Sequence, residues 1–147
     1  EFVRTLCHRY LIVRSAWVYG IGRDFVSTVL NAAADPTCPW LAVPTDRFAS
    51  PTSADDLTAA VEQLIDHDTL GIYHIVCQGR CSRYDFAQAI LKAAHMEDKL
   101  ELHPIRAADA GSTPSYTVLD NLMLRLDNLP QPRPWKEALN EYINSLQ

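Results

Sequence analysis

Short apolar runs alternate along this chain with stretches whose apolar residues recur at helical spacing. The run over residues 11–20, LIVRSAWVYG, starts apolar and ends in Trp17, Tyr19 and Gly20. It predicts a buried strand that carries an aromatic side chain and small residues to a sheet edge. Because ligands in open α/β sheets lie at the carboxyl ends of strands, this strand is expected to form one wall of a ligand site.

The remaining elements follow from the same periodicity. The expected helices cover residues 25–34, 83–94 and 134–146, with one more after a cap at Thr52 or Ser53. The expected strands cover residues 39–43, 71–77, 100–105 and 116–119, and the expected loops cover residues 44–52 and 107–115. Strands that alternate with helices predict an α/β fold.

The first ten residues are typical of the end of a helix, with Phe2, Val3 and Leu6 on one face. No glycine-rich phosphate-binding turn precedes the strand that begins at residue 11. The chain is therefore expected to be the second half of an enzyme, whether as a truncated chain, a proteolytic product or a partial gene. Its bare apolar strand is expected to drive self-association, or to belong to a dimer of the parent protein.

Composition narrows the class of partner. The 147 residues, 48% hydrophobic and 21% charged, are typical of one globular domain. A formal net charge of −5 without a basic block argues against nucleic acid as a partner. No apolar run approaches the ~20 residues that span a bilayer, so no membrane partner is expected. Four cysteines without compact spacing favour a reduced, cytoplasmic setting.

His74, Cys77 and Cys81 are potential metal ligands, but their spacing lacks a clear fourth ligand. Zinc sites need four converging ligands, and the first two of these residues lie on a predicted strand, so no metal site is expected. Ser82, three residues before Asp85, is interpreted as the start of a helix. It is not interpreted as a nucleophile, because no His–acid pair can be placed beside it.

Seven motifs occur in a recognisable order: RSAWVYG, GRDFV, TDRFASPTSADDL, GIYHI, CSRYDFAQAI, TPSYTVLDN and RPWKEAL. With this order and spacing, the chain resembles the C-terminal half of the dTDP-4-dehydrorhamnose reductase family. These are extended short-chain dehydrogenase/reductases that use NADPH to finish dTDP-L-rhamnose. The resemblance implies the C-terminal portion of an NAD(P)-binding Rossmann-type fold. Residues 1–35 would end the Rossmann-type half, and residues 36–147 would mainly form the substrate-binding subdomain.

The resemblance also implies a division of labour between the two halves. The family's glycine-rich turn and its catalytic Tyr-x-x-x-Lys pair belong to the N-terminal half. Neither motif occurs here, and Tyr19 and Tyr73 have no lysine four residues further on. No catalytic residue is therefore expected in this chain, and the chain alone is expected to be inactive.

The family match places substrate- and cofactor-binding residues in this sequence. It implies that Trp17 is a wall for the deoxysugar, because an indole face suits the apolar face of a sugar ring. Arg47 is expected to contact the diphosphate, which a guanidinium fits well. The expected substrate-binding residues are Trp17, Asp24, Phe25, Asp46, Arg47, Ser50, Pro51 and Thr52. Ser15 and Ala16 are expected near the nicotinamide, where small side chains permit close approach.

Several positions depart from the family pattern. Arg47 stands where the family usually has Gln, and Ala49 where it has Gly. Asp24 replaces a usual Asn, Arg83 replaces an aromatic residue, and Thr113-Pro114 stands in place of Arg-Pro. These departures bear on contacts with the nucleotide sugar rather than on the fold.

The implied cofactor is NADPH, with NADH as the alternative. Magnesium has been described at a dimer interface in the family, and Asp55 is the candidate ligand that aligns, although an ordinary acid at a helix start explains it better. Asp24, Arg47 and Ala49 keep a second function open, because the regulatory β subunit of methionine adenosyltransferase shares this architecture. A third alternative is a remnant without activity.

Overall fold

The computed structural model describes residues 2–107 and 115–146. Its helices are α1 (Phe2–Leu6), α2 (Phe25–Ala34), α3 (Ala54–Asp66), α4 (Arg83–Ala93), α5 (Leu122–Leu126) and α6 (Trp135–Ser145). Its strands are β1 (Leu11–Arg14), β2 (Val18–Tyr19), β3 (Trp40–Pro44), β4 (Phe48–Ala49), β5 (Thr52–Ser53), β6 (Gly71–His74), β7 (Cys81–Ser82), β8 (Glu101–Ile105) and β9 (Tyr116–Thr117). The alternation of strands and helices confirms the α/β class.

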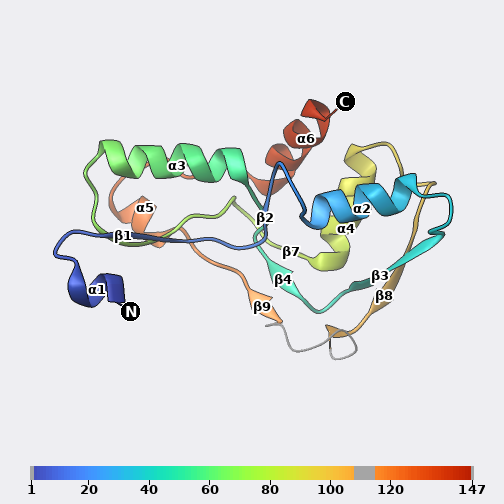
Figure 1. Ribbon diagram of the computed structural model, residues 1–147, viewed down its shortest axis with the longest axis horizontal. Coiled ribbons are helices and arrows are strands. Elements are labelled where there is room, and N and C mark those ends of the chain that lie inside the picture. The colour runs from blue at the N-terminus through green and yellow to red at the C-terminus, as the bar shows by residue number, and fades with distance from the viewer. Residues whose placement is uncertain (1, 108–114, 147) are drawn as a thin grey trace.

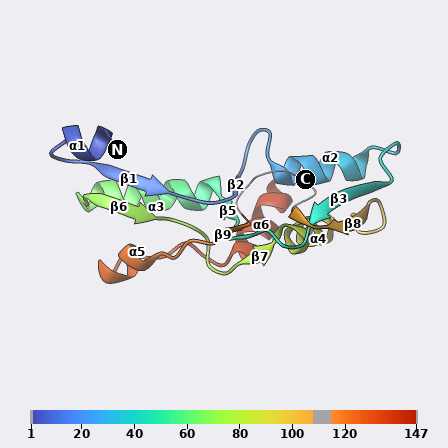
Figure 2. The ribbon, with the colours of Figure 1, turned by 90° about the horizontal axis from the view of Figure 1, so that it is seen from below.

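The strands form small sheets that follow one another along the molecule. β1 pairs with β6, β2 with β5 and β3 with β8, each pair in parallel. β4 lies between β7, to which it is antiparallel, and β9, to which it is parallel. In Figures 1 and 2, α3 runs along β1 and β6 at one end, and α2 and α4 flank β3 and β8 at the other. The two-residue strands lie between these ends.

Side-chain caps begin three of the helices, and the sequence predicts those of α3 and α4, whereas Asp24 was expected to bind substrate. A capping box between Asp24 and Ser27 begins α2, and a second between Ser82 and Asp85 begins α4. Of the two candidates for the start of α3, Ser53 is the residue whose side chain caps the helix. These caps satisfy backbone N–H groups that a helix leaves without partners.

The run over residues 11–20 was expected to be one buried strand, and that expectation is wrong. It forms two short strands, β1 and β2, separated by a bend at which Trp17 has a φ of +42°. A left-handed backbone cannot continue a β-ladder, and for a bulky residue it is a genuine outlier. The side chains of β1 are only half-buried or exposed, because this strand pairs with β6 alone among the described residues.

Two further expectations need correction. The segment over residues 44–52 is not simply a loop, because Phe48 pairs with both Ser82 and Tyr116, and Thr52 pairs with Val18. Helix α5 was not predicted, since five residues are too short to show helical periodicity. The expected loop over residues 107–115 lies largely outside the described residues. Self-association through the free edge of β1 stays a prediction.

Two apolar clusters form most of the core. The larger joins α2, α4, α6 and β3, with members that include Val26, Val29, Val43, Phe86, Ile90, Trp135, Leu139 and Ile143. The smaller joins α3, β6 and α5 through Ala60, Leu64, Tyr73, Ile75 and Leu124. Helix α2, which the resemblance assigns to the Rossmann-type half, therefore packs with elements of the following portion.

The turn after β2 is held between α3 and α6 at Gly20. Its N–H donates to Asp24 Oδ2 at 2.8 Å, and its carbonyl oxygen accepts from the Tyr142 hydroxyl at 2.6 Å. A Cβ at this position would lie 2.8 Å from the Cβ of Ala54, at the first residue of α3. Only glycine allows this approach without displacing the helix.

We expect Gly20→Ala to destabilise the chain by about 1–3 kcal/mol, because overpacking forces the turn away from α3. Urea unfolding of the single variant and of Gly20→Ala/Ala54→Gly measures the effect. The second substitution removes the clashing methyl group, so the double variant should recover part of the loss. Strictly additive effects would contradict the contact.

Candidate functional site

A hollow of about 830 Å³ lies at the carboxyl end of β1. The described residues that line it are Arg14, Ser15, Ala16, Trp17, Arg47, Arg83, Tyr116, Thr117, Val118 and Leu119. It therefore brings together four of the residues that the sequence predicts for a ligand site: Ser15, Ala16, Trp17 and Arg47. The expectation that the end of this strand forms one wall of the hollow agrees with this geometry.

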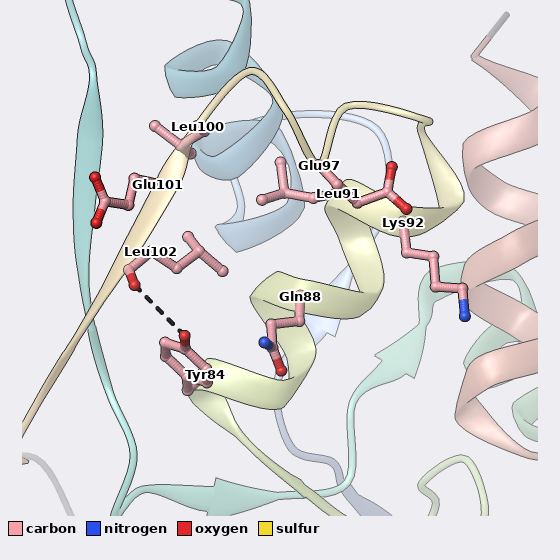
Figure 3. A pocket seen from close by; sticks show the side chains of 8 residues that line it. All are labelled: Tyr84, Gln88, Leu91, Lys92, Glu97, Leu100, Glu101 and Leu102. Carbon is pink, nitrogen blue, oxygen red and sulfur yellow. Dashed lines mark hydrogen bonds between the residues drawn. The ribbon is translucent and has the colours of Figure 1, made fainter.

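A separate hollow of about 560 Å³ lies between α4 and β8 (Figure 3). Figure 3 shows Tyr84 and Gln88 of α4 facing Leu102 of β8, and the Tyr84 hydroxyl donates to the Leu102 carbonyl oxygen at 3.4 Å. Its described lining contains none of the predicted site residues. The larger hollow is therefore the candidate functional site.

Trp17 is held rigidly at the edge of the candidate site. Its carbonyl oxygen accepts a hydrogen bond from the Thr52 N–H at 3.3 Å. The Trp17 ring stacks on Phe86, with centroids 6.3 Å apart, and the Arg83 guanidinium lies 3.7 Å from its ring centroid. A left-handed backbone at a bulky residue is a strained conformation of the kind that clusters at functional sites.

Arg83, at the start of α4, was not among the predicted site residues. Its guanidinium lies between two aromatic rings, 3.7 Å from the centroid of Trp17 and 4.4 Å from that of Phe25. Burial lowers the pKa of this guanidinium to about 10; the nearby Cys81 raises the pKa and the charge of Arg47 lowers it. The sequence signal was the departure at this position, an arginine where the family usually has an aromatic residue.

The segment before β4 is tied to neighbouring elements by its backbone and side chains. Asp46 Oδ1 accepts from the Ala107 N–H at 2.7 Å, and an Arg47 Nη donates to the Ala107 carbonyl oxygen at 3.3 Å. The Arg47 carbonyl oxygen accepts from the Arg83 N–H at 2.8 Å. Arg47 thus lines the candidate site, whereas the Asp46 carboxylate is used to hold the end of the β8 segment.

Ser50, Pro51 and Thr52 lie inside the protein rather than in the candidate site. Ser50 is 1% exposed and Thr52 is fully buried. The Thr52 hydroxyl accepts from the Cys77 N–H at 3.2 Å and donates to the Ser50 carbonyl oxygen at 3.1 Å. Buried hydroxyls that are satisfied in this way support the architecture, and Ser50 itself lines a neighbouring hollow of about 400 Å³.

Asp24 and Phe25 also have structural partners. The two carboxylate oxygens of Asp24 accept from the N–H groups of Gly20 and Ser27 at 2.8 and 2.7 Å. The Phe25 ring lies beside Arg83 and stacks on Phe86 with centroids 5.9 Å apart. Phe25 is therefore next to a lining residue, while Asp24 caps α2.

Ser15 and Ala16 form the narrow floor of the candidate site. The Ser15 Oγ is buried and has no hydrogen-bond partner among residues 2–107 and 115–146. Ala16 packs against Ala49 and Val76 in a small apolar cluster. A buried hydroxyl without a partner is costly unless a ligand supplies one, so Ser15 fits a polar group of a bound molecule.

The two tyrosines considered above do not have the properties of a proton donor near neutral pH. Burial raises the pKa of the Tyr19 hydroxyl. Hydrogen bonding to Asp127 raises the pKa of Tyr73, a contact that links β6 to the end of α5. A general acid works best with a pKa near the working pH, and both shifts move away from it.

Residues 1–147 match the family model described as the RmlD substrate binding domain. The chain belongs to this family. SpsK, the spore coat polysaccharide biosynthesis protein of Bacillus subtilis (strain 168), is 37% identical over 97% of this chain and 50% of its own length. The chain thus spans about half the length of the curated relatives it matches.

Solved structures place the RmlD substrate binding domain in the same fold. The dTDP-4-dehydrorhamnose reductase of Clostridium acetobutylicum ATCC 824 aligns with a TM-score of 0.93 and 39% identity, over 99% of this chain and 52% of that one. The reductase of Bacillus anthracis str. Ames, solved in complex with NADP, aligns with a TM-score of 0.92 and 31% identity, over 99% and 51%. The expected resemblance and the Rossmann-type fold class are confirmed, and nothing found supports the methionine adenosyltransferase alternative.

The described residues offer neither a metal-binding cluster nor a membrane-spanning helix. Within the described part of the chain, no three His, Cys, Asp or Glu residues are grouped so that they could hold a metal ion. Asp55 is exposed in the first turn of α3. No helix among the described residues is both long and apolar enough to cross a membrane.

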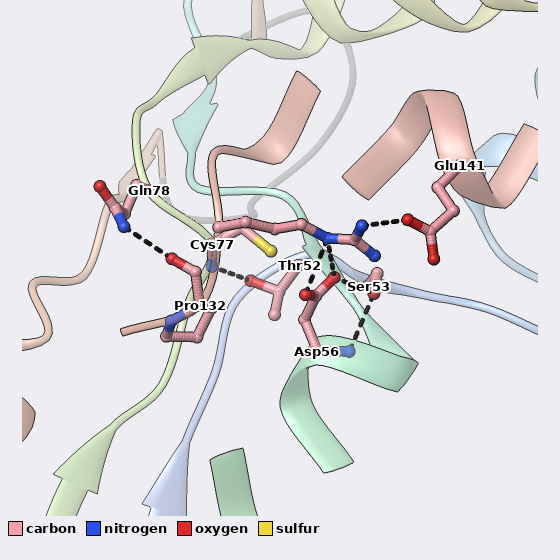
Figure 4. Close-up of polar contacts among 8 residues, drawn as sticks. Thr52, Ser53, Asp56, Cys77, Gln78, Pro132 and Glu141 are labelled. Atoms are coloured by element: carbon pink, nitrogen blue, oxygen red, sulfur yellow. Dashed lines mark hydrogen bonds and ion pairs between the residues drawn. The ribbon is translucent and has the colours of Figure 1, made fainter. Parts of the chain in front are cut away.

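A charged cluster away from the candidate site joins α3 to α6 (Figure 4). The Arg133 Nε donates to both carboxylate oxygens of Asp56, at 3.0 and 3.2 Å, and an Nη of Arg133 pairs with Glu141. The hydrogen bond and charge of Arg133 lower the pKa of Glu141. The ionised carboxylate is therefore favoured in the folded chain, so the pair stabilises the fold above the ordinary pKa of about 4.5.

Because this stabilisation is lost as pH falls through the lowered pKa of Glu141, Glu141→Gln should flatten the pH dependence. We expect the variant to unfold more easily at neutral pH and to differ less from the wild type as pH falls below the ordinary pKa. Urea midpoints across a pH series measure this, with Glu137→Gln on the same helix as the control. Curves for wild type and Glu141→Gln that stay parallel throughout would contradict the prediction.

Proposed function

We propose that this chain forms the sugar-nucleotide side of the cleft of an NADPH-dependent dTDP-4-dehydrorhamnose reductase. In this reaction the C4 ketone of the keto sugar is reduced, the last step of dTDP-L-rhamnose synthesis. The observation that carries the proposal is the hollow at the end of β1, which joins Ser15, Ala16, Trp17 and Arg47 in a chain of this family.

In this proposal the residues of the hollow position the substrate. Trp17 offers an apolar wall to the deoxysugar and excludes water from the reacting carbon. Arg47, whose side chain lines the hollow, binds the diphosphate. Holding the keto carbon at reacting distance lowers the barrier by several kcal/mol, and this is the contribution that a positioning half can make.

Ser15 and Ala16 fit the cofactor side of the same hollow. The Ser15 Oγ, which has no hydrogen-bond partner among the described residues, supplies a polar contact, and the small Ala16 permits close approach. NADPH supplies the hydride when bound, and NADP in the B. anthracis relative supports this choice over NADH. The proton is assigned to a tyrosine of the family's N-terminal half. Magnesium has no role in this proposal.

The remaining predicted substrate residues are assigned a positioning role. Asp24 fixes the start of α2, and Asp46 fixes the segment that carries Arg47. Ser50, Pro51 and Thr52 are buried. The Phe25 ring contacts the Arg83 guanidinium. Substitutions at these positions should therefore act through the geometry of Trp17 and the arginines.

We expect the 147-residue chain alone to show no reductase activity, because it contains neither a glycine-rich turn nor a Tyr-x-x-x-Lys pair. The measurement is NADPH oxidation in the presence of the dTDP keto sugar, with the B. anthracis reductase as the positive control. Substrate-dependent oxidation by the purified chain would overturn this expectation.

In a full-length reductase that carries these residues, Trp17→Ala should lower kcat/KM for the keto sugar about tenfold or more, or ~1.4 kcal/mol. The reason is the place of Trp17 in the wall of the hollow. Trp40→Ala is the matched control, since Trp40 lies on β3 outside the described lining and stacks on His103. Unchanged kinetics with unchanged stability would mean that Trp17 only packs.

A further inference from the structure

The hollow concentrates positive charge in an acidic chain. Arg14, Arg47 and Arg83 line it, and none of its described lining residues is Asp or Glu. The whole chain carries a formal net charge of −5. A cleft lined by one sign of charge focuses the field and attracts ligands of the opposite sign.

Arg83 is the most unusual of these arginines. Its guanidinium is half-buried between Trp17 and Phe25, and within residues 2–107 and 115–146 no carboxylate forms an ion pair with it. The charge of Arg47 acts on it with the same sign, which lowers the pKa of Arg83. This half-buried cation lies near another cation and has no carboxylate paired with it among the described residues, and a bound anion would supply a counter-ion.

We propose that Arg83 is a specificity-determining residue that, together with Arg47, selects an anionic oxygen group of the bound nucleotide sugar. The inference rests on the proposed function in taking the ligand to be a nucleotide sugar. The anion is the diphosphate, because the keto deoxysugar of the proposed function carries no carboxylate. The planar N–H donors of a guanidinium recognise two oxygens of such a group.

The two aromatic rings that contact Arg83 explain how this residue distinguishes an anionic ligand from an uncharged one. The contacts with the rings of Trp17 and Phe25 restrict the guanidinium before a ligand arrives, so little side-chain freedom is lost on binding. They also cover part of the guanidinium, and a charge-assisted hydrogen bond is stronger where less water reaches it. A lysine would keep the charge but lose both the planar stack and the paired donors.

The test measures binding to the chain itself by isothermal titration calorimetry, with dTDP and the uncharged nucleoside thymidine as probes. We expect the wild type to bind dTDP more tightly than thymidine. We expect Arg83→Gln to weaken dTDP binding about tenfold or more, and Arg83→Lys to restore it only in part. The control is Arg4→Gln, which removes the same charge from exposed helix α1 and should leave the affinity within about twofold.

Two sugar nucleotides test which group the arginine recognises. Equal losses by Arg83→Gln for dTDP-glucose and dTDP would support the diphosphate, whereas a loss confined to dTDP-glucuronate would point to a ring carboxylate and overturn the inference. A wild type that binds no probe, or an Arg83→Gln variant that binds every probe as the wild type does, would overturn the inference.

An NMR measurement on the wild type tests the same inference without a substitution, so it does not depend on whether a variant folds. In the wild type, the Nε–Hε signal of Arg83 should shift in NMR spectra on addition of dTDP and stay in place with thymidine. The absence of any dTDP-dependent shift would count against the role of Arg83. Failure of the reductase proposal has a separate signature, since a full-length protein could bind dTDP through Arg83 and still reduce no keto sugar.

Discussion

The hydrogen bonds of Thr52 hold the centre of the molecule together. Its N–H donates to Trp17, and its buried hydroxyl joins Cys77 to Ser50. Strands β2, β4 and β5 have two residues each, too few for their ladder bonds to hold them in place. Because buried polar groups must be satisfied, this single residue links its own segment to those of Trp17 and Cys77. The position of Trp17 at the edge of the hollow depends on it.

The parts of the fold that the sequence predicts are those with local causes. One-sided apolar faces define α2 and α4, and the cap at Ser82 defines the start of α4, without reference to the rest of the chain. The two-residue strands are different, because Phe48 becomes part of a strand only when Ser82 and Tyr116 are brought beside it. Such pairings have no periodicity of their own. The break in the first strand likewise depends on the tertiary environment of one residue.

The residues of the candidate site also fall into those that the sequence predicts and those that only the tertiary structure reveals. Ser15, Ala16 and Trp17 could be predicted because a strand end delivers neighbours in sequence to one edge. Thr52 looked like a binding residue because a polar residue in a presumed loop was assumed to be exposed, whereas the backbone satisfies its hydroxyl inside the protein. Arg83 was missed as a lining residue because its ring partners are remote in sequence, and only packing reveals a cation held between them.

The side chain of Asn121 occupies one side of the segment that follows β6. Its amide oxygen accepts from the Val76 N–H at 2.9 Å, and its amide nitrogen donates to the Val76 carbonyl oxygen at 2.7 Å. These are the bonds that a neighbouring strand would make, so the amide imitates one rung of a ladder. The Ile75 N–H meanwhile donates to Arg14, on the side of β1. Because the Asn121 side chain already occupies the backbone groups of Val76, another strand cannot pair there. The backbone groups on the outer edge of β1 can pair with such a strand, so the sheet of β1 and β6 can extend from that edge.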